Sequence, residues 1–333
     1  MARLSKRLLF EKVVWAIRGC GWSVIYLSKL SDHPFRIRMF RDTETYTVRV
    51  YIWNMTHGGG HARPADEYRI QITGVSRFEA EPEGKTLILG WWDEASVFAG
   101  FDYRKHTALL GASPSMQIRE EFLREAYERG FAPCNKGNRE IAIAFRPDFI
   151  AEYIRFLEPL HDAGKSPVDF SILSSISQDP AAVNDSDLQK VSKPRRSAVA
   201  SIRRALRDSS FNQRVLTAYG HQCAMCSLQM DLVEGAHIVP VAVPDSTDET
   251  SNGLALCALH HKAYDRAIVT VDDRYHVLMS GSRKDRLRQI GHDGGMDSFI
   301  AGLRPLIILP PAVSDRPNIR YLRKGREVRD WAD

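Results

Sequence analysis

The sequence contains no long uncharged apolar segment and only five cysteines among its 333 residues. No window approaches the ~18 apolar residues that a membrane-spanning helix needs. The apolar stretch near the N-terminus is interrupted by Glu11, Lys12 and Arg18, so it indicates an amphipathic helix running into a strand rather than a signal peptide. We therefore expect a cytoplasmic protein with no membrane contact.

The cysteines do not form the even set that is typical of a disulfide-stabilised secreted domain. Cys20 and Cys134 lie isolated in apolar surroundings, as small core residues do. The other three, Cys223, Cys226 and Cys257, fall within one short stretch. This clustering needs a different explanation from core packing.

A strong excess of one charge sign is also absent, because 46 Lys and Arg residues oppose 41 Asp and Glu residues. The basic residues are nevertheless concentrated in two runs. Residues 193–214 carry seven of them and one acid, and residues 316–329 carry six and one acid. Both runs flank the clustered cysteines, where contacts to phosphate groups would be useful. The alternative is a solvated helix face and a frayed tail.

Residues 1–163 alternate strand-like and helix-like patterns, which predicts an α+β domain built on a mixed or antiparallel sheet. β-branched and aromatic runs separated by turn residues indicate the strands. Charged residues on one face of a helical period indicate the helices. The strand patterns cover 35–42, 46–55, 67–75, 85–92 and 140–147, and the helical patterns cover 116–131 and 147–162.

The composition changes after residue 163. Residues 164–194 are rich in Ser, Asp, Pro, Gln and Asn, and we interpret them as a linker. A helical run follows and ends at Gly220. The second domain is therefore expected to cover residues 195–333.

A CxxC motif and a CxxH motif stand about thirty residues apart in this second domain. Cys223 and Cys226 form the first, and Cys257 and His260 form the second. Two such pairs supply the four soft ligands that a tetrahedral structural zinc site uses. A CxxC alone is weak evidence, but the paired motifs predict structural Zn²⁺. Buried free thiols beside an unrelated histidine are the alternative.

Three further polar residues follow the order strand, loop, helix. His237 lies in the strand-like segment AHIVP, and Asn252 precedes Gly253 before a short apolar strand. The helix that starts near Cys257 carries His261 and Asp265 four positions apart, so both project from one face. Because successive helix residues point about 100° apart, His260 can face the zinc while His261 faces a cleft.

The pattern F-x3-VL-x-AY-x3-C-x2-C, then AHI-x-P, then NGL-x-LC-x2-HH-x3-D, resembles the HNH (ββα-metal) endonuclease family. It covers residues 211–271 and is similar to the HNH modules of bacterial restriction-type nucleases. The resemblance implies a zinc-stabilised ββα-metal fold for the second domain. It also implies metal-dependent hydrolysis of phosphodiester bonds in double-stranded DNA.

Carried over by position, the resemblance gives each residue a role. His237 would be the general base, for which a neutral imidazole is suited. His261 would bind a catalytic divalent ion, Mg²⁺ or Mn²⁺, that polarises the phosphoryl group. Asn252 would fix the loop of the ββα motif by bonding to its backbone rather than act in the chemistry.

One position departs from the family pattern. Many members carry an aspartate, a metal ligand, directly before the base histidine, where this chain has Ala236. Asp265 is the natural replacement, because it lies one helical turn after His261 and some relatives use a second histidine at that spacing. A capping or surface carboxylate is the alternative role for Asp265, and Glu234 is a weaker candidate ligand.

The first basic run supplies candidate phosphate contacts, and residues 1–163 are interpreted as a DNA-recognition domain. A single HNH centre cuts one strand, so we expect a homodimer at least on DNA. The candidate phosphate contacts are Arg195, Arg196, Arg203, Arg204, Arg207 and Arg214. In the first domain, polar or aromatic candidates at strand ends and loops are His57, His61, Arg63, Arg69, Trp91, Trp92, Arg104, Lys105 and His106.

Three functions remain open from the sequence. The first is a restriction-type or modification-sensing defence nuclease. The second is a zinc-stabilised DNA-binding module whose catalysis has decayed, which Ala236 favours. The third is a nonspecific nuclease effector gated by the N-terminal domain. The joint presence of His237, Asn252 and His261 argues against decay.

Overall fold

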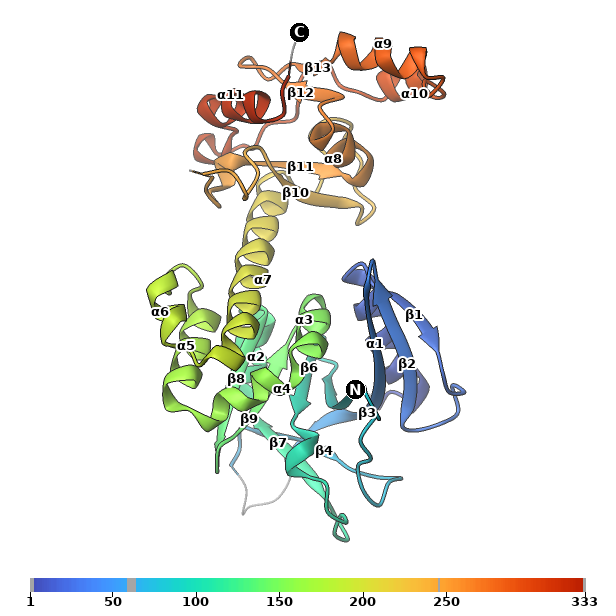
Figure 1. Ribbon diagram of the computed structural model, residues 1–333, viewed down its shortest axis with the longest axis vertical. Helices are drawn as coiled ribbons and strands as arrows, with labels where there is room; N and C mark the ends of the chain where they lie inside the picture. Colours follow the sequence, from blue (N-terminus) through green and yellow to red (C-terminus); the bar gives the residue numbers. More distant parts are fainter. Residues whose placement is uncertain (1–2, 59–63, 245, 332–333) are drawn as a thin grey trace. The chain divides into compact units, whose positions relative to one another are not determined.

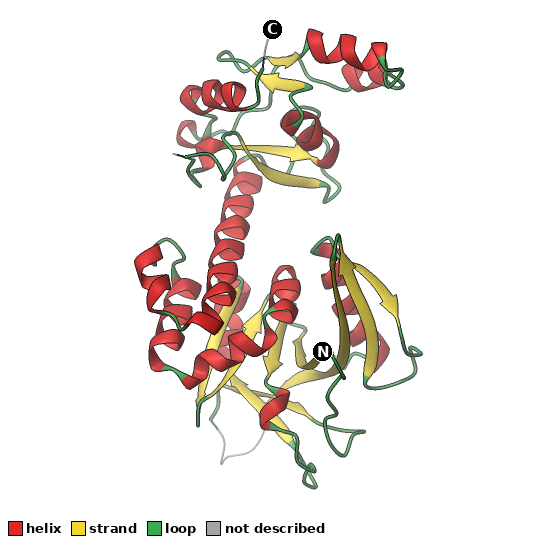
Figure 2. Cartoon of the chain, in the orientation of Figure 1, coloured by secondary structure: helices red, strands yellow, loops and turns green. Residues whose placement is uncertain are grey.

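The computed structural model describes residues 3–58, 64–244 and 246–331. Its chain divides into two compact units, residues 1–206 and 207–333. The boundary falls within a long helix, α7 (Lys193–Ala218), and the elements of both units are drawn in Figures 1 and 2. Among the helices of the described residues, none is both long and apolar enough to span a bilayer.

A mixed sheet of nine strands within the described residues forms the frame of the first unit. Seven strands follow the order β1-β2-β3-β5-β6-β9-β8, while β4 pairs with β3 and β7. Strands β3 and β5 are parallel, and the other pairs are antiparallel. The predicted α+β class with a mixed sheet is confirmed. The strands are β1 (Ser23–Tyr26), β2 (Phe35–Arg41), β3 (Glu44–His57), β4 (Glu67–Gln71), β5 (Lys85–Trp92), β6 (Val97–Phe101), β7 (Ser115–Arg119), β8 (Phe131–Gly137) and β9 (Glu140–Phe145).

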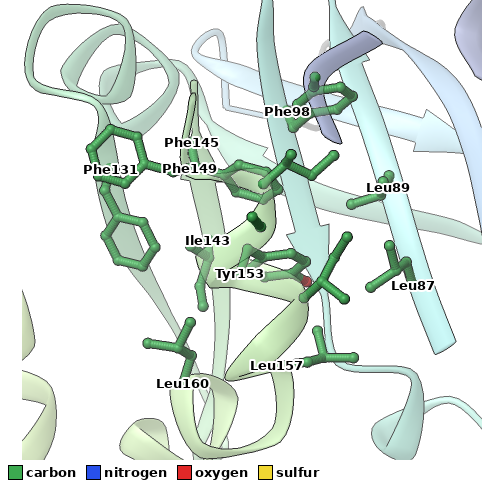
Figure 3. Close-up of a cluster of buried hydrophobic side chains, with 14 of the residues drawn as sticks. Leu87, Leu89, Phe98, Phe131, Ile143, Phe145, Phe149, Tyr153, Leu157 and Leu160 are labelled. Atoms are coloured by element: carbon green, nitrogen blue, oxygen red, sulfur yellow. The ribbon is translucent and has the colours of Figure 1, made fainter. Parts of the chain in front are cut away.

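Alternation along each strand sends side chains into two cores on the two faces of this sheet. On β5, Leu87 and Leu89 enter the larger core, part of which Figure 3 shows, and Ile88 and Trp92 enter the other. Each such buried side chain contributes about 1.5–3 kcal/mol relative to an exposed one. Residues of α1 (Lys6–Gly19), α3 (Ile150–Arg155) and α4 (Leu157–Asp162) complete the larger core, and α2 (Glu120–Arg129) packs on the other.

The segment expected to be a linker, residues 164–194, instead forms part of the first unit. It contains α5 (Pro167–Gln178) and α6 (Asp185–Lys190). Leu173 and Ile176 of α5 are fully buried in the larger core. A few well-spaced apolar residues therefore suffice to dock this polar segment, and the unit boundary shifts from residue 194 to residue 206.

The helix expected over residues 116–131 is shorter, because its first residues form strand β7. Met116 and Ile118 alternate into the core while β7 pairs with β4. This period of two conflicts with the helical period that begins only at Glu120.

Several polar or aromatic residues of the first unit that were candidates for DNA contact have structural partners. Trp91 and Trp92 are buried in the two cores. Arg104 forms ion pairs with Asp102 and Asp162. Two other candidates, His61 and Arg63, lie outside the described residues.

The second unit is built around a hairpin of β10 (Val233–His237) and β11 (Gly253–Cys257), followed by helix α8 (Ala258–Asp265). The last part of α7 packs against one face of the hairpin. At Gly253, which pairs with His237, a β-carbon would collide with Val215 and Phe211 of α7. Glu234 on the other face contacts α8 through His261. The ββα order that the sequence indicates is therefore present.

The remaining elements of the second unit follow α8. Strands β12 (Val269–Val271) and β13 (Val277–Met279) form a small antiparallel pair. Helices α9 (Gly281–Gln289), α10 (Met296–Ala301) and α11 (Ile319–Val328) come next. Leu322 of α11 is buried in the same core as the hairpin and α8, which fixes the C-terminal helix beside them.

Candidate active site and zinc centre

Four residues with soft ligand atoms converge in the second unit. Within the described residues, Cys223, Cys226, Cys257 and His260 form the one group of three or more potential ligands whose atoms all lie within 4.8 Å of one another. The Nδ1 atom of His260 lies 3.5 Å from Cys223 Sγ and 3.3 Å from Cys257 Sγ. These are the four residues that the sequence predicts as zinc ligands.

The quartet fits a structural zinc ion. Three thiols and one imidazole are a donor set for tetrahedral Zn²⁺, and closed four-ligand sites are structural. Cys223, Cys257 and His260 are buried, and Cys226 is half-buried, so the group is largely shielded from water. The ligands come from the turn before β10 and from the start of α8, so a bound ion joins segments on both sides of the hairpin.

His261, the neighbour of His260, points away from the quartet and lies between two carboxylates. Its Nδ1 atom is 2.7 Å from Glu234 Oε1, and its Nε2 atom is 3.5 Å from Asp265 Oδ2. The hydrogen bond that His261 donates to the Glu234 carboxylate raises the pKa of His261, and the same contact lowers the pKa of Glu234. A carboxylate that holds the proton on one ring nitrogen leaves the other nitrogen free to bind a cation.

Arg329, directly after α11, connects the His261–Asp265 pair with the end of β10. Its Nη2 atom lies 3.2 Å from both Asp265 Oδ1 and the carbonyl oxygen of His237. Its guanidinium also stacks over the ring of Tyr264, 4.3 Å from the centroid. The side chain is only 9% exposed, so Arg329 is a fixed link between β10 and α8.

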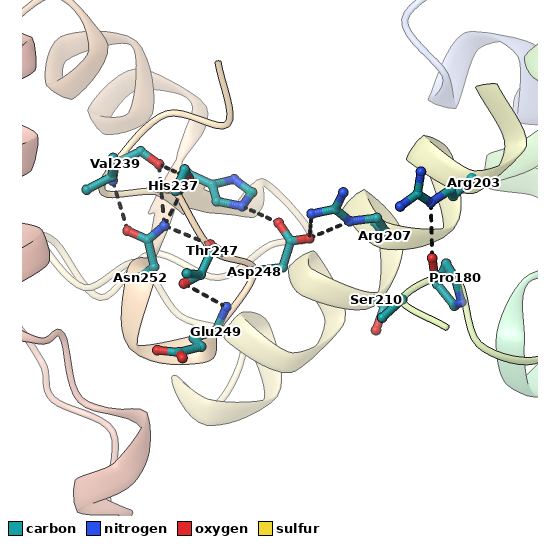
Figure 4. Close-up of polar contacts among 12 residues, drawn as sticks. Pro180, Arg203, Arg207, Ser210, His237, Val239, Thr247, Asp248, Glu249 and Asn252 are labelled. Carbon is teal, nitrogen blue, oxygen red and sulfur yellow. Dashed lines mark hydrogen bonds and ion pairs between the residues drawn. The ribbon is translucent and has the colours of Figure 1, made fainter. Parts of the chain in front are cut away.

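The imidazole of His237 is held on the opposite face of the hairpin, where Figure 4 shows its polar contacts. Its Nε2 atom lies 3.1 Å from Asp248 Oδ1. The other carboxylate oxygen of Asp248 accepts from Arg207 Nε at 2.7 Å. The ring also stacks on Phe211, with centroids 3.6 Å apart and an interplanar angle of 11°. These contacts fix both the position and the plane of the ring.

The hydrogen bonding of His237 defines its protonation. Burial lowers the pKa of His237, and the neighbouring Asp248 carboxylate partly offsets this effect. Burial raises the pKa of Asp248, but hydrogen bonds and charge from Arg207 and His237 lower it overall, so its carboxylate is ionised and accepts a hydrogen bond from Nε2–H. At neutral pH the ring is therefore neutral, and Nδ1 carries the free lone pair.

Asn252 is fully buried and joins the loop after β10 to the hairpin. Its Oδ1 atom accepts from the backbone NH of Val239 at 2.9 Å, and its Nδ2 atom donates to the carbonyl of Thr247 at 2.8 Å. Both contacts appear in Figure 4. This is the loop-fixing position that the sequence predicts for Asn252, and it also positions the segment that carries Asp248.

The structure brings some of the predicted site residues into contact and keeps others apart. His261 and Asp265 are adjacent, but the imidazole of His237 has no direct contact with them among the described residues. Residues three apart on a strand point to opposite faces, which separates His237 from Glu234. Ala236, where many family members carry a metal ligand, is 1% exposed and packs in the hydrophobic core.

Most of the arginines predicted to contact phosphate are engaged within the protein. Arg195 pairs with the buried Asp169, and Arg207 pairs with Asp248. Arg204 is exposed and has no ion pair or side-chain hydrogen bond among the described residues. Arg196 donates to the carbonyls of Gln189 and Val191. Arg203 contacts Asp185 and the carbonyl of Pro180. Arg214 contacts Ser210 and the carbonyl of Asp248.

Sequence reasoning missed three residues of this site. Asp248 lies in a loop of Pro, Asp, Ser and Thr residues that has no periodic pattern, and Arg329 lies 64 positions from Asp265. No local signal distinguishes either one. Phe211 was part of the quoted pattern but not recognised as a partner of His237. Glu234 was a weak candidate metal ligand, and its position in the predicted strand was the signal that pointed to it.

Comparisons with known proteins give matches to parts of the chain and to its length as a whole. Residues 46–154 match the family described as methylase-associated X1. The modification-dependent TagI restriction endonuclease is a structural match at 12% identity and a TM-score of 0.30, covering 83% of this chain and 80% of that one. No curated protein matches the chain.

The remaining match falls on the site itself. Residues 223–272 match the HNH endonuclease family, and this range contains all four residues of the zinc quartet together with His237, Asn252, His261 and Asp265. The C-terminal unit of this chain contains an HNH endonuclease domain.

Proposed function

We propose that the protein is a metal-dependent DNA endonuclease of the restriction type, which hydrolyses phosphodiester bonds with the HNH domain of its second unit. The observation that carries the proposal is the position of His261. Glu234 contacts its Nδ1 atom, while its Nε2 atom faces the Asp265 carboxylate beside the zinc quartet. A decayed site would have no reason to keep this arrangement in a matched HNH segment.

In this proposal, His237 is the general base. Its Nδ1 atom accepts a proton from the water that attacks phosphorus, while the bond from phosphorus to the leaving oxygen breaks. Asp248 is a positioning residue, because it holds the proton on Nε2 and stabilises the positive charge that develops on the ring. Arg329 contacts both Asp265 and the backbone carbonyl of His237, so it joins the end of β10, which carries the proposed base, to the proposed metal ligand.

The residues proposed to hold the divalent ion are His261, through Nε2, and Asp265. The Asp265 carboxylate is the donor of this pair that suits Mg²⁺ or Mn²⁺, and both ions usually complete their shell with water and substrate oxygens. A divalent ion held there would supply positive charge to the phosphoryl oxygen and the leaving group. Glu234 then orients His261 from the opposite ring nitrogen.

Replacing Asp265 by alanine should weaken divalent-ion binding while leaving the base intact. Asp265→Ala is expected to need at least tenfold more Mn²⁺ than the wild type to reach half of its maximal cleavage rate, as metal-site changes typically cost ~10–100-fold in affinity. Direct Mn²⁺ titration by calorimetry provides a readout that is independent of cleavage. Asp297→Ala is the matched control, because it removes an exposed carboxylate of α10 in the same unit. A wild-type Mn²⁺ affinity in Asp265→Ala would exclude Asp265 as a ligand.

Replacing Asp248 by asparagine should change the pH dependence of cleavage. The reaction needs neutral His237, so activity falls as the pH drops below the pKa of this residue. Asp248 raises that pKa, so Asp248→Asn is expected to move the acidic limb to lower pH and to reduce the plateau rate, since the base is weaker. Asp272→Asn, which alters the His276–Asp272 pair, is the control. A lower rate with an unshifted acidic limb would indicate a purely structural role for Asp248.

The first unit is proposed to be the DNA-recognition part, and the match of residues 46–154 to a methylase-associated family supports a restriction context. We also propose that this unit senses modified bases in the DNA. Because a single HNH centre cuts one strand, we further propose that two copies of the chain act together on a double-stranded site.

Digestion of plasmid and of phage DNA with and without base modifications tests the proposed function. Discrete fragments that depend on Mg²⁺ or Mn²⁺ are expected. A smear of products would instead indicate a nonspecific nuclease. The buried Ala236 favours the competing function of a DNA-binding module without catalysis, and DNA binding with no cleavage under any metal condition would establish that function.

A further inference from the structure

A second feature of the HNH unit lies beside Asp265. A cavity of about 440 Å³ is lined by Asp265 together with four arginines, which are Arg266, Arg283, Arg286 and Arg329. Two of them, Arg283 and Arg286, come from α9, beyond the residues that match the HNH family. The family match therefore assigns no role to this part of the cavity.

The charge of this cavity is not balanced within the protein. Arg329 pairs with Asp265, the one acidic residue of the lining. The guanidinium groups of Arg266, Arg283 and Arg286 have no ion pair or side-chain hydrogen bond in the part of the chain that the structure describes. By contrast, Arg288 on the same helix pairs with Asp285 and does not line the cavity. Like charges that converge on one concave surface raise the local potential and attract an anion.

The geometry of α9 supports a built site rather than a random basic surface. Arg283 and Arg286 are three positions apart, so they lie on the same face of the helix. Leu287 and Ile290 supply apolar walls to the same cavity. A guanidinium presents a planar set of donors that matches the oxygens of a phosphate group, which makes arginine the preferred residue for such a ligand.

The position beside Asp265 identifies the source of the phosphate. Asp265 lines the cavity with Oδ1 bonded to Arg329, and its Oδ2 atom lies 3.5 Å from His261 Nε2. When the scissile phosphate of a DNA duplex lies at His261 and Asp265, the next phosphate of the same DNA strand lies about 3.4 Å further along the axis of the duplex. We propose that this arginine cavity binds a DNA backbone phosphate that flanks the scissile one, an inference that rests on the proposed endonuclease function.

Salt-dependent binding of a labelled DNA duplex to the full chain, without added divalent ions, tests the proposal. Each lost phosphate contact reduces the slope of log K against log salt by about 0.9. In the double variant Arg283→Ala/Arg286→Ala, the salt slope is expected to fall by the value of one phosphate contact. In Arg283→Lys/Arg286→Lys most of the salt slope should remain, because lysine retains the charge. Arg288→Ala, on the same helix, should match the wild type.

Three results would decide against the proposal or separate it from the proposed function. If the alanine double variant has an unchanged salt slope and the wild-type protein cleaves DNA, the phosphate site in the cavity is overturned and the proposed endonuclease function stands. A reduced slope in a protein that never cleaves DNA would support the phosphate site and refute the nuclease function. Polyglutamate is titrated in parallel as an acidic polypeptide. Loss of polyglutamate binding in the alanine double variant, with unchanged DNA binding, would assign the cavity to an acidic protein segment and overturn the proposal. Zinc content and thermal unfolding report whether each variant is folded.

Discussion

Replacing Cys257 by serine is expected to remove zinc from the protein and to unfold its second unit. Cys257 ends β11 and caps α8, so it joins the hairpin to the helix that carries His261 and Asp265. Cys223 and Cys257 also belong to the hydrophobic core of this unit. Structural zinc in small domains contributes on the order of 10 kcal/mol to folding, more than the net stability of most domains. A serine oxygen is a poor substitute for the thiolate.

Metal analysis and thermal unfolding of the full chain measure this effect. We expect stoichiometric zinc in the wild type, no zinc in Cys257→Ser, and loss of the unfolding transition that belongs to the second unit. Cys20→Ser is the matched control, because Cys20 is a thiol of the first unit that bonds to backbone carbonyls and has no role in the quartet. A zinc-loaded Cys257→Ser protein with an unchanged transition would refute the structural role of the ion.

Local motifs were the part of the site that the sequence could predict. The CxxC and CxxH spacings fix which side chains can converge on one ion, and the structure places those four together. His261 and Asp265 follow from helix periodicity, since residues four apart share a face. These inferences succeed because each depends on geometry within a turn or one helical repeat.

Contacts between distant segments could not be predicted in the same way. Asp248 reaches His237 only because Asn252 fixes the intervening loop, and a single sequence gives no sign of this contact. Arg329 reaches Asp265 and β10 after α11 has packed on the core. Partners of the α7 arginines, such as Asp169 and Asp248, likewise become visible only in the folded chain, and contact of these arginines with phosphate stays a prediction.

The fold of the first unit shows a similar limit. The apolar and aromatic run of residues 85–92 predicts the strand β5, and both faces of this strand are buried. The polar composition of residues 164–194 favoured a linker, yet α5 packs into the core with the side that carries Leu173 and Ile176. Composition averages over a segment, whereas burial depends on which few positions face the core.

Replacing His237 by alanine is expected to reduce the cleavage rate strongly while leaving DNA binding and zinc content unchanged. Loss of a general base typically costs ~10²–10⁴-fold in rate, and additional Mg²⁺ or Mn²⁺ cannot replace a proton acceptor. The backbone carbonyl of His237, which Arg329 contacts, is retained in the variant. The rate deficit should therefore persist at every metal concentration, in contrast to the partial recovery expected for Asp265→Ala.

The residual activity of His237→Ala provides a second test of the role. Without the imidazole, the proton must go to solvent hydroxide, so the remaining rate should rise steadily with pH and show no plateau above the wild-type pKa. His276→Ala is the matched control, because His276 forms a comparable pair with the half-buried Asp272, 3.0 Å away, elsewhere in the same unit. A His237→Ala protein that cleaves within tenfold of the wild type and keeps the wild-type pH profile would transfer the base role to another group. Because Nδ1 of His237 carries the free lone pair while Asp248 holds Nε2, we expect the large deficit and the altered profile to appear together.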